Sequence, residues 1–368
     1  MKIFQRFLSL AIVVVLLNSA AYADSSTAVM FQLPEQFTYT NFTMSEKGYC
    51  IAGYDGISPV EIPVGMYYDP SGKQVWQHMN IDYPGNIYRS MVELDNGSLA
   101  AIRSVDYDGN FDIELFDGNR SVYKTIPMVN PFHITPVQGG FLVDSAPSAE
   151  SSQISMFDYS GNVQWTIDWD EKMRFNRIIS SNSKFYAVGT RTDHGCIVTF
   201  DSNGNLLWYH NSDLPSEYID VVPNEENLFV LATSWEEDRN FIAAYNATEA
   251  LWESDLPATI GNNDITTKII QASAITLCNN QIVVASAARE QDVGKLALHY
   301  FTLTGSNIHN ETIDVNGIYP NEVALMSDGN QLRYAVLGRK TERNINWQPV
   351  TNIPFFALID TVVTQPDT

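Results

Sequence analysis

The densest group of oxygen-bearing side chains in the sequence lies between residues 106 and 112. Asp106, Asp108, Asn110 and Asp112 occupy alternate positions there, and oxygen ligands at alternate positions of a loop suit a calcium ion. The segment departs from an EF-hand loop, because Phe111 stands at the sixth position, which that loop gives to glycine. A solvated hairpin turn explains the same residues without a metal. Both interpretations stay open, and we expect no other cofactor.

A second group consists of arginine, histidine and tryptophan residues that recur in comparable places along the chain. Each lies near a hairpin between two expected strands or near a link that follows, so a repeated architecture would bring them to one face. Guanidinium groups among aromatic rings suit an anionic ligand, a peptide or a glycan. Loop residues are also polar simply because loops contact water. The members of this expected binding face are Arg103, His133, Arg174, Arg191, His194, Trp235, Arg289 and Arg339.

Local catalytic motifs are missing from the sequence. The Gly-x-Ser-x-Gly elbow of serine hydrolases does not occur, and the 6 histidines show no metal-ligand spacing. Two acids contributed by distant segments would leave no local motif, so a glycoside hydrolase is compatible with the sequence. We therefore expect a binding protein or scaffold rather than an enzyme. The alternative is an extracellular hydrolase or lyase of glycans with its site in a central funnel.

A repeated motif indicates how these residues are positioned. A strand of alternating polarity ends in an aromatic residue and aspartate, a tight turn follows, and the next strand carries tryptophan. The motif recurs at Asp69–Trp76, Asp158–Trp165 and Asp201–Trp208. Glycine supplies the positive φ of the turn, and the aspartate carboxylate can bond to turn amides. The large tryptophan ring can pack on a neighbouring repeat.

Weaker copies extend this repeat over most of the chain. Their spacing is close to the length of a four-stranded propeller blade, about 40 to 50 residues. The marker positions are Asp69, Asp117, Asp158, Asp201, Asn246, Thr302 and Asp360. They predict an all-β chain that forms a single β-propeller of seven four-stranded blades, with eight blades or an unclosed ring of six as alternatives. The last blade lacks an outer strand, and we expect residues 28–33 to supply it and close the ring.

The motif resembles the PQQ-like, or quinoprotein-type, β-propeller repeat, in which a hairpin with aspartate, glycine and tryptophan closes each blade. The glycines and tryptophans of the three sharp copies match that pattern, and serine or asparagine stands where threonine is usual. The resemblance implies the propeller fold. Quinoprotein dehydrogenases of the family have adjacent cysteines at the cofactor, whereas Cys50, Cys196 and Cys278 are isolated here. Because the chain departs from the family's enzymes at this point, we expect a non-catalytic member of the family that does not bind PQQ.

The first residues have the features of a signal peptide. Lys2 and Arg6 precede an apolar run from Phe7 to Leu17, and small residues lead to Ala23. We expect a signal peptide at residues 1–23, cleavage near Ala23, and one propeller domain at residues 24–368. The protein would then be secreted or periplasmic. An uncleaved membrane anchor is the alternative, and no later segment has the apolar length of a membrane span.

The composition restricts the class of partner. The chain has 43 acidic and 21 basic side chains and a formal net charge of −22. Such a surface repels nucleic acid and anionic lipid. We expect a monomer that binds a protein or a cell-surface ligand such as a glycan. The three cysteines lie in apolar stretches and are expected to be buried.

Overall fold

The computed structural model describes residues 27–33, 37–56, 61–80, 85–105, 110–225, 227–262, 265–290, 293–315, 318–328, 331–343 and 349–362. The expected signal peptide lies outside these residues. All regular elements within them are β-strands, and consecutive strands pair as antiparallel hairpins. The described residues form no apolar helix that could cross a membrane. The all-β prediction is confirmed.

The first three blades each take four consecutive strands. The first contains β2 (Phe37–Ser45), β3 (Gly48–Asp55), β4 (Ile62–Tyr68) and β5 (Gln74–Met79). The second contains β6 (Tyr88–Glu93), β7 (Leu99–Ser104), β8 (Asn110–Phe116) and β9 (Val122–Val129). The third contains β10 (Pro131–Val137), β11 (Gly140–Ser148), β12 (Ser151–Asp158) and β13 (Val163–Trp169).

The fourth and fifth blades share one long strand. The fourth contains β14 (Met173–Ser181), β15 (Lys184–Arg191), β16 (His194–Asp201) and the first half of β17 (Leu206–Asn224). The second half of β17 pairs with β18 from Ser216 onwards and begins the fifth blade. That blade continues with β18 (Asn227–Ser234), β19 (Arg239–Tyr245) and β20 (Ala250–Asp255).

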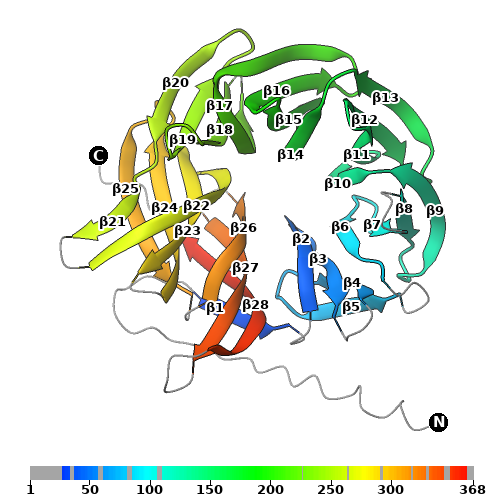
Figure 1. Cartoon of the computed structure of the whole chain (residues 1–368), viewed down its shortest axis with the longest axis horizontal. Helices are drawn as coiled ribbons and strands as arrows, with labels where there is room; N and C mark the ends of the chain where they lie inside the picture. Colours follow the sequence, from blue (N-terminus) through cyan, green and yellow to red (C-terminus); the bar gives the residue numbers. More distant parts are fainter. Residues whose placement is uncertain are drawn as a thin grey trace.

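Figure 1 shows the last two blades following the others around a central axis. The sixth contains β22 (Ile265–Cys278), β23 (Gln281–Glu290), β24 (Val293–Thr302) and β25 (Asn307–Asp314), and a short β21 (Thr259–Asn262) pairs with its inner strand. The seventh contains β26 (Ile318–Asp328), β27 (Gln331–Arg343), β28 (Pro349–Val362) and β1 (Thr27–Gln32). The described strands thus form seven blades.

The strand β1 is the outer strand of the seventh blade. It pairs antiparallel with β28, from Thr27 opposite Asp360 to Gln32 opposite Phe355. This confirms that an N-terminal strand completes the last blade, at residues 27–32 rather than 28–33. Phe356 and Leu358 of the same blade pack against the first blade in one buried cluster.

The hydrophobic core is divided among the junctions between blades. Each of the seven junctions has its own cluster of buried apolar side chains, and the junction between the seventh and first blades is packed like the others. The middle strands pack on both faces and are buried throughout, as in β7, whereas the outer β13 alternates between half-buried and exposed residues. Cys50, Cys196 and Cys278 are buried within these junctions, as expected.

Six of the seven marker residues begin the turns between third and fourth strands, whereas Asp360 lies inside β28, where it pairs with Thr27 of β1. In the fourth blade the Asp201 N–H donates to the Asn205 carbonyl at 3.0 Å, and Gly204 takes a φ of +81°. The indole N–H of Trp165 in the preceding blade donates to the Ser202 carbonyl of this turn at 2.9 Å. The predicted packing of the repeat tryptophan on the neighbouring blade is therefore confirmed at this junction.

Two faces of the disc can be told apart by their connections. Hairpins between second and third strands lie beside the links between blades, since the Ser216 N–H donates to the Asp193 carbonyl at 3.0 Å and the Leu256 N–H to the Asn240 carbonyl at 2.9 Å. We call this side the link face. The other side, the turn face, has the turns between first and second strands and those between third and fourth strands.

Candidate functional site

A β-bulge recurs at the same place in every inner strand. The register of each inner strand against the second strand shifts by one residue there, which leaves one residue unpaired and re-aims the next side chain. The bulged residues are Thr40, Arg89, Phe132, Asn176, Ile219, Ser273 and Asn321. The residues that follow them all line the central cavity, and we call them the channel ring: Asn41, Ser90, His133, Arg177, Asp220, Ala274 and Glu322.

The cavity inside this ring has a volume of about 720 Å³ and is lined by the inner strands of all seven blades. On the link face it reaches the hairpin between β18 and β19, where Trp235 and Asp238 line it. A smaller cavity of about 170 Å³ shares Thr43, Thr135 and Arg177 with it and extends to the turn after β2. The centre of the described molecule is thus an open polar channel rather than an apolar plug.

Several channel-ring side chains also fasten one blade to the next. The Ser90 hydroxyl oxygen accepts from the Ile134 N–H at 3.4 Å, and an Asp220 carboxylate oxygen accepts from the Ile275 N–H at 3.0 Å. The Glu322 carboxylate accepts from the backbone of Phe42 in the same way. Each acceptor bonds to the residue just after the ring position of the following blade.

The bulged residues add a second set of bonds between blades. The Thr40 hydroxyl donates to the Tyr88 carbonyl, the Arg89 guanidinium donates to the Pro131 carbonyl at 2.9 Å, and the Asn176 amide donates to the Tyr218 carbonyl at 2.9 Å. Each donor therefore meets the residue just before the bulge of the following blade. Because both sets repeat around the axis, the fold fixes where the ring side chains stand.

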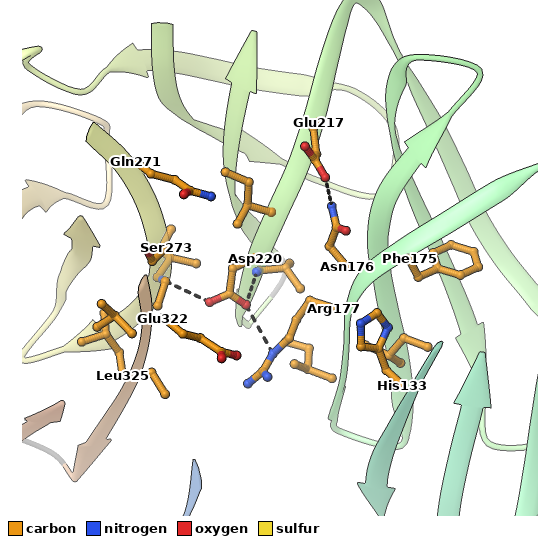
Figure 2. Close-up of a pocket in the computed structure, with 18 of the residues that line it drawn as sticks. His133, Phe175, Asn176, Arg177, Glu217, Asp220, Gln271, Ser273, Glu322 and Leu325 are labelled. Atoms are coloured by element: carbon orange, nitrogen blue, oxygen red, sulfur yellow. Dashed lines mark hydrogen bonds and ion pairs between the residues drawn. The ribbon is translucent and has the colours of Figure 1, made fainter. Parts of the chain in front are cut away.

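Charged groups converge on one side of the channel (Figure 2). The Arg177 Nε lies 3.4 Å from an Asp220 carboxylate oxygen, and the Arg177 side chain is 51% exposed to the cavity. Figure 2 shows its guanidinium beside the carboxylates of Asp220 and Glu322. One end of the guanidinium is held, and the rest can meet a ligand, because arginine has five donors.

The two acids of the channel ring have altered acidity. Burial raises the pKa of the Asp220 carboxyl, while Arg177 and two backbone amides oppose the rise. Burial raises the pKa of Glu322 to about 7, and the amide of Phe42, then His133 and Arg177, limit the rise. Near neutral pH the ring can therefore hold a proton on Glu322. A carboxyl group in that state can both donate and accept a hydrogen bond.

The link-face mouth presents polar groups beside one large exposed ring. Trp235 is 51% exposed, although tryptophan is usually well buried. The Asn176 amide donates to the Glu217 carboxylate at 2.8 Å, and Gln271 lines the cavity nearby. An aromatic face next to amides and carboxylates can stack on a ligand while it bonds to hydroxyl or amide groups.

Of the eight residues expected on the binding face, His133 and Trp235 line the channel. The His133 ring nitrogen lies 3.4 Å from the Asp144 carboxylate. Two others, Arg174 and Arg191, lie at the link between the third and fourth blades, and His194 lies at the link between the fourth and fifth. Arg174 is exposed, Arg191 pairs with Glu171 and bonds to the Tyr209 hydroxyl, and His194 bonds to the Ser212 carbonyl at 2.8 Å.

The remaining three lie apart from the channel. Arg103 is only 2% exposed, and its guanidinium is 2.6 Å from Glu114 and 2.7 Å from Asp112. It therefore holds its own blade together and does not reach a ligand. Arg289 is exposed at the end of β23, and Arg339 in β27 is half-buried near Tyr39, whose pKa it lowers against the larger effect of burial.

The expected calcium ligands are only partly described. Asp106 and Asp108 lie outside the described residues. Asn110 begins β8, and the Asp112 carboxylate is occupied by Arg103. No group of three or more histidine, cysteine or acidic side chains suited to a metal occurs in the part of the chain that the structure describes.

Sequence reasoning missed Arg177, Asp220 and Glu322, the charged members of the channel ring. A signal was present, because a polar residue follows two places after an aromatic one in four inner strands. The pairs are Tyr39 and Asn41, Tyr88 and Ser90, Phe175 and Arg177, and Tyr218 and Asp220. The bulge between the two members puts the first into a core cluster and the second into the channel.

Comparison with known proteins identifies the fold and no family. No protein-family model matches the sequence, and no curated protein matches it. The β-propeller domain of the Trilobed protease from Pyrococcus furiosus aligns with a TM-score of 0.55 at 11% identity, over 88% of this chain and 94% of that one. Sqt1 from Chaetomium thermophilum aligns with a TM-score of 0.51 at 9% identity, over 90% and 97%.

A prolyl endopeptidase also aligns, with a TM-score of 0.52 at 10% identity over 90% of this chain. This chain spans about half of that protein, because the match covers 51% of its length. At such low identities the three likenesses show a shared β-propeller and nothing about activity.

Proposed function

We propose that this chain is an exported β-propeller that binds its ligand at the link-face mouth of the central channel and carries out no quinone chemistry. In this proposal the blades are PQQ-like repeats, and the protein acts in the periplasm or outside the cell after cleavage near Ala23. The partner is a glycan or a protein segment of the cell surface.

The open polar channel is the observation that supports this proposal. A cavity of about 720 Å³ is of the size that takes a small ligand or part of a chain. Trp235 exposes its ring at the mouth, where burial against a ligand would remove apolar area from water. Exposed aromatic rings are enriched where proteins bind partners.

The charge of the channel indicates the class of ligand. Two arginines, Arg177 and Arg239, line it together with the acids Glu217, Asp220, Asp238 and Glu322. Arg239 is already neutralised by Glu237, Glu253 and Asp255. A ligand with many negative groups would therefore be repelled, whereas a neutral polyhydroxyl chain or a peptide without excess acid fits.

Binding at the mouth can be tested with Trp235→Ala. We expect the mature protein to bind a member of a panel of neutral polysaccharides and short peptides, and the variant to lose at least tenfold in affinity by calorimetry. Tyr123→Ala is the matched control, because that ring is also exposed but lies on the outer strand β9. Equal losses in both variants, or none in either, would contradict a site at the mouth.

A glycan hydrolase is the second candidate, and the raised pKa of Glu322 favours it. An acid that keeps its proton near neutral pH can protonate a leaving group. Under the binding proposal we expect no release of reducing sugar from the polysaccharide that binds. Turnover that is retained in Trp235→Ala but abolished by Glu322→Gln would establish the enzyme instead.

A further inference from the structure

The turn of the fifth blade departs from the repeat. Five-residue turns elsewhere close by a bond from the first N–H to the fifth carbonyl, with a positive φ at the fourth residue, as in Asp201–Asn205. At Asn246 the turn is one residue shorter, because its N–H donates to the Glu249 carbonyl at 3.1 Å. This turn contains no glycine and no residue of positive φ.

The glycine-containing turns of the fourth and sixth blades cover the tryptophan of the preceding blade, with Gly204 against Trp165 and Gly305 against Trp252. Trp165 donates its indole N–H to the Ser202 carbonyl at 2.9 Å. The ring also lies so close to Gly204 that a Cβ there would be 2.9 Å from the Trp165 Cδ2. Only glycine allows this approach, because it has no Cβ. The covering turn therefore combines a carbonyl that accepts from the indole with a residue that has no side chain.

Trp208 is the equivalent residue of the next junction, where the shorter turn places no glycine against the ring. Within the described residues its indole N–H has no hydrogen bond. A cavity of about 410 Å³ lies above it on the turn face, lined by Tyr186, Leu207 and Tyr245 among others. Leu207 is 50% exposed at its edge, although it is apolar.

Thr199 is a buried polar residue beside this cavity. It pairs with Trp208 across β16 and β17, and it lines the cavity. The residue is only 5% exposed, and its hydroxyl has no partner in the described part of the chain. A buried hydroxyl without a hydrogen bond costs free energy that a bound group can recover.

We propose that the cavity over Trp208 binds a glycine-containing β-turn of a partner protein, laid on the indole as the turn of Gly204 lies on Trp165. A carbonyl of the guest turn accepts from the Trp208 indole N–H, and its glycine packs on the ring. This site lies on the turn face and is independent of the channel.

The probe is a disulfide-cyclised peptide with the sequence of this protein's own turn, Asp-Ser-Asn-Gly-Asn. We expect it to shift the Trp208 indole resonance of the labelled mature protein in a saturable way. The same peptide with alanine in place of glycine should bind at least tenfold more weakly. Trp208→Phe, which keeps a ring but removes the donor, should weaken binding several-fold.

A graft provides the control that does not depend on removing a side chain. Replacing residues 246–249 by the five-residue turn of residues 201–205 should cover Trp208 and abolish binding of the peptide. Retained binding in the graft would overturn the proposal. Equal affinity for the glycine and alanine peptides, no shift at millimolar peptide, or a shift at Trp235 instead of Trp208 would overturn it as well.

Discussion

Glu322 combines two roles at the scale of a single residue. Its carboxylate accepts from the backbone of Phe42, and so fastens the seventh blade to the first. The same burial that makes this contact raises its pKa to about 7. The charged form is therefore less favourable in the folded protein than in the unfolded chain, opposite to the usual effect of a paired acid.

The sign of the resulting pH dependence follows directly. Between the ordinary pKa of 4.5 and about 7 the folded state holds a proton that the unfolded chain has released, so stability falls as the pH rises through this window. Glu322→Gln should remove this fall. The free energy of unfolding of the variant, relative to that of the unaltered protein, should therefore be about 2 kcal/mol higher at pH 8 than at pH 5. Thermal unfolding from pH 5 to 8 measures it.

Glu150→Gln is the control for this prediction, because Glu150 is an exposed acid in the hairpin between β11 and β12. It should leave the pH profile as in the unaltered protein. A profile of Glu322→Gln that follows the same slope as that of the control would show that Glu322 does not titrate in this window.

Gly97 and Gly204 have the same φ but different surroundings, so alanine substitutions at the two positions distinguish the cost of backbone strain from the cost of lost packing. Gly97 and Gly204 both have a φ of +81°, but nothing lies within 4 Å of a Cβ built on Gly97, whereas Trp165 lies 2.9 Å from one on Gly204. Gly97→Ala should cost about 1 kcal/mol through backbone strain alone. Gly204→Ala should cost about 2 kcal/mol or more, because the ring must also move. Equal costs in urea unfolding would mean that the tryptophan packing adds nothing.

The bulged inner strand is the element that makes the site. Its position cannot be derived from the pattern of any single strand, because a bulge depends on the register with the neighbouring strand. The turns were predictable, since the chemistry of Asp201 to Gly204 is local. The channel ring was not, because its seven members come from seven segments that meet only in the complete fold.

The outer strand β1 is the other element on which the ring depends. Phe31 packs on Phe356 with ring centroids 5.8 Å apart and lies against Gly72 of the first blade. Phe31→Ala should lower the free energy of unfolding by about 3 kcal/mol and make residues near Leu33 more sensitive to protease. Gln32→Ala, at an exposed position of the same strand, should change stability by less than about 0.5 kcal/mol.

Similar protease sensitivity in Phe31→Ala and the unaltered protein would contradict this role of β1. A loss of stability in both variants would point to a general weakness of the strand instead of the contact with Phe356.

At the scale of the whole molecule, sequence reasoning identified the propeller, the marker turns and the N-terminal strand. It also predicted that several arginine side chains would be available to bind a ligand, although some of them pair with acids of the same chain. With 43 acids to 21 bases, arginines of the links meet carboxylates, as Arg191 meets Glu171 and Arg239 meets three acids. Glu171 comes from the link before the blade of Arg191, and the acids around Arg239 come from neighbouring segments of its own blade, so no local pattern records which partners meet.

The repetition of the bulge has a consequence for how such proteins can diversify. Duplication of one blade repeats the bulge, and with it the channel-ring position, in every copy. The seven ring positions all face the central cavity. The hydrophobic clusters lie at the junctions between blades, so exchanging a ring side chain that makes no bond to the next blade leaves these junctions intact. Ala274 is the ring position of the sixth blade, and its side chain is only a methyl group. Single substitutions at such ring positions can therefore change the ligand preference while the fold stays the same.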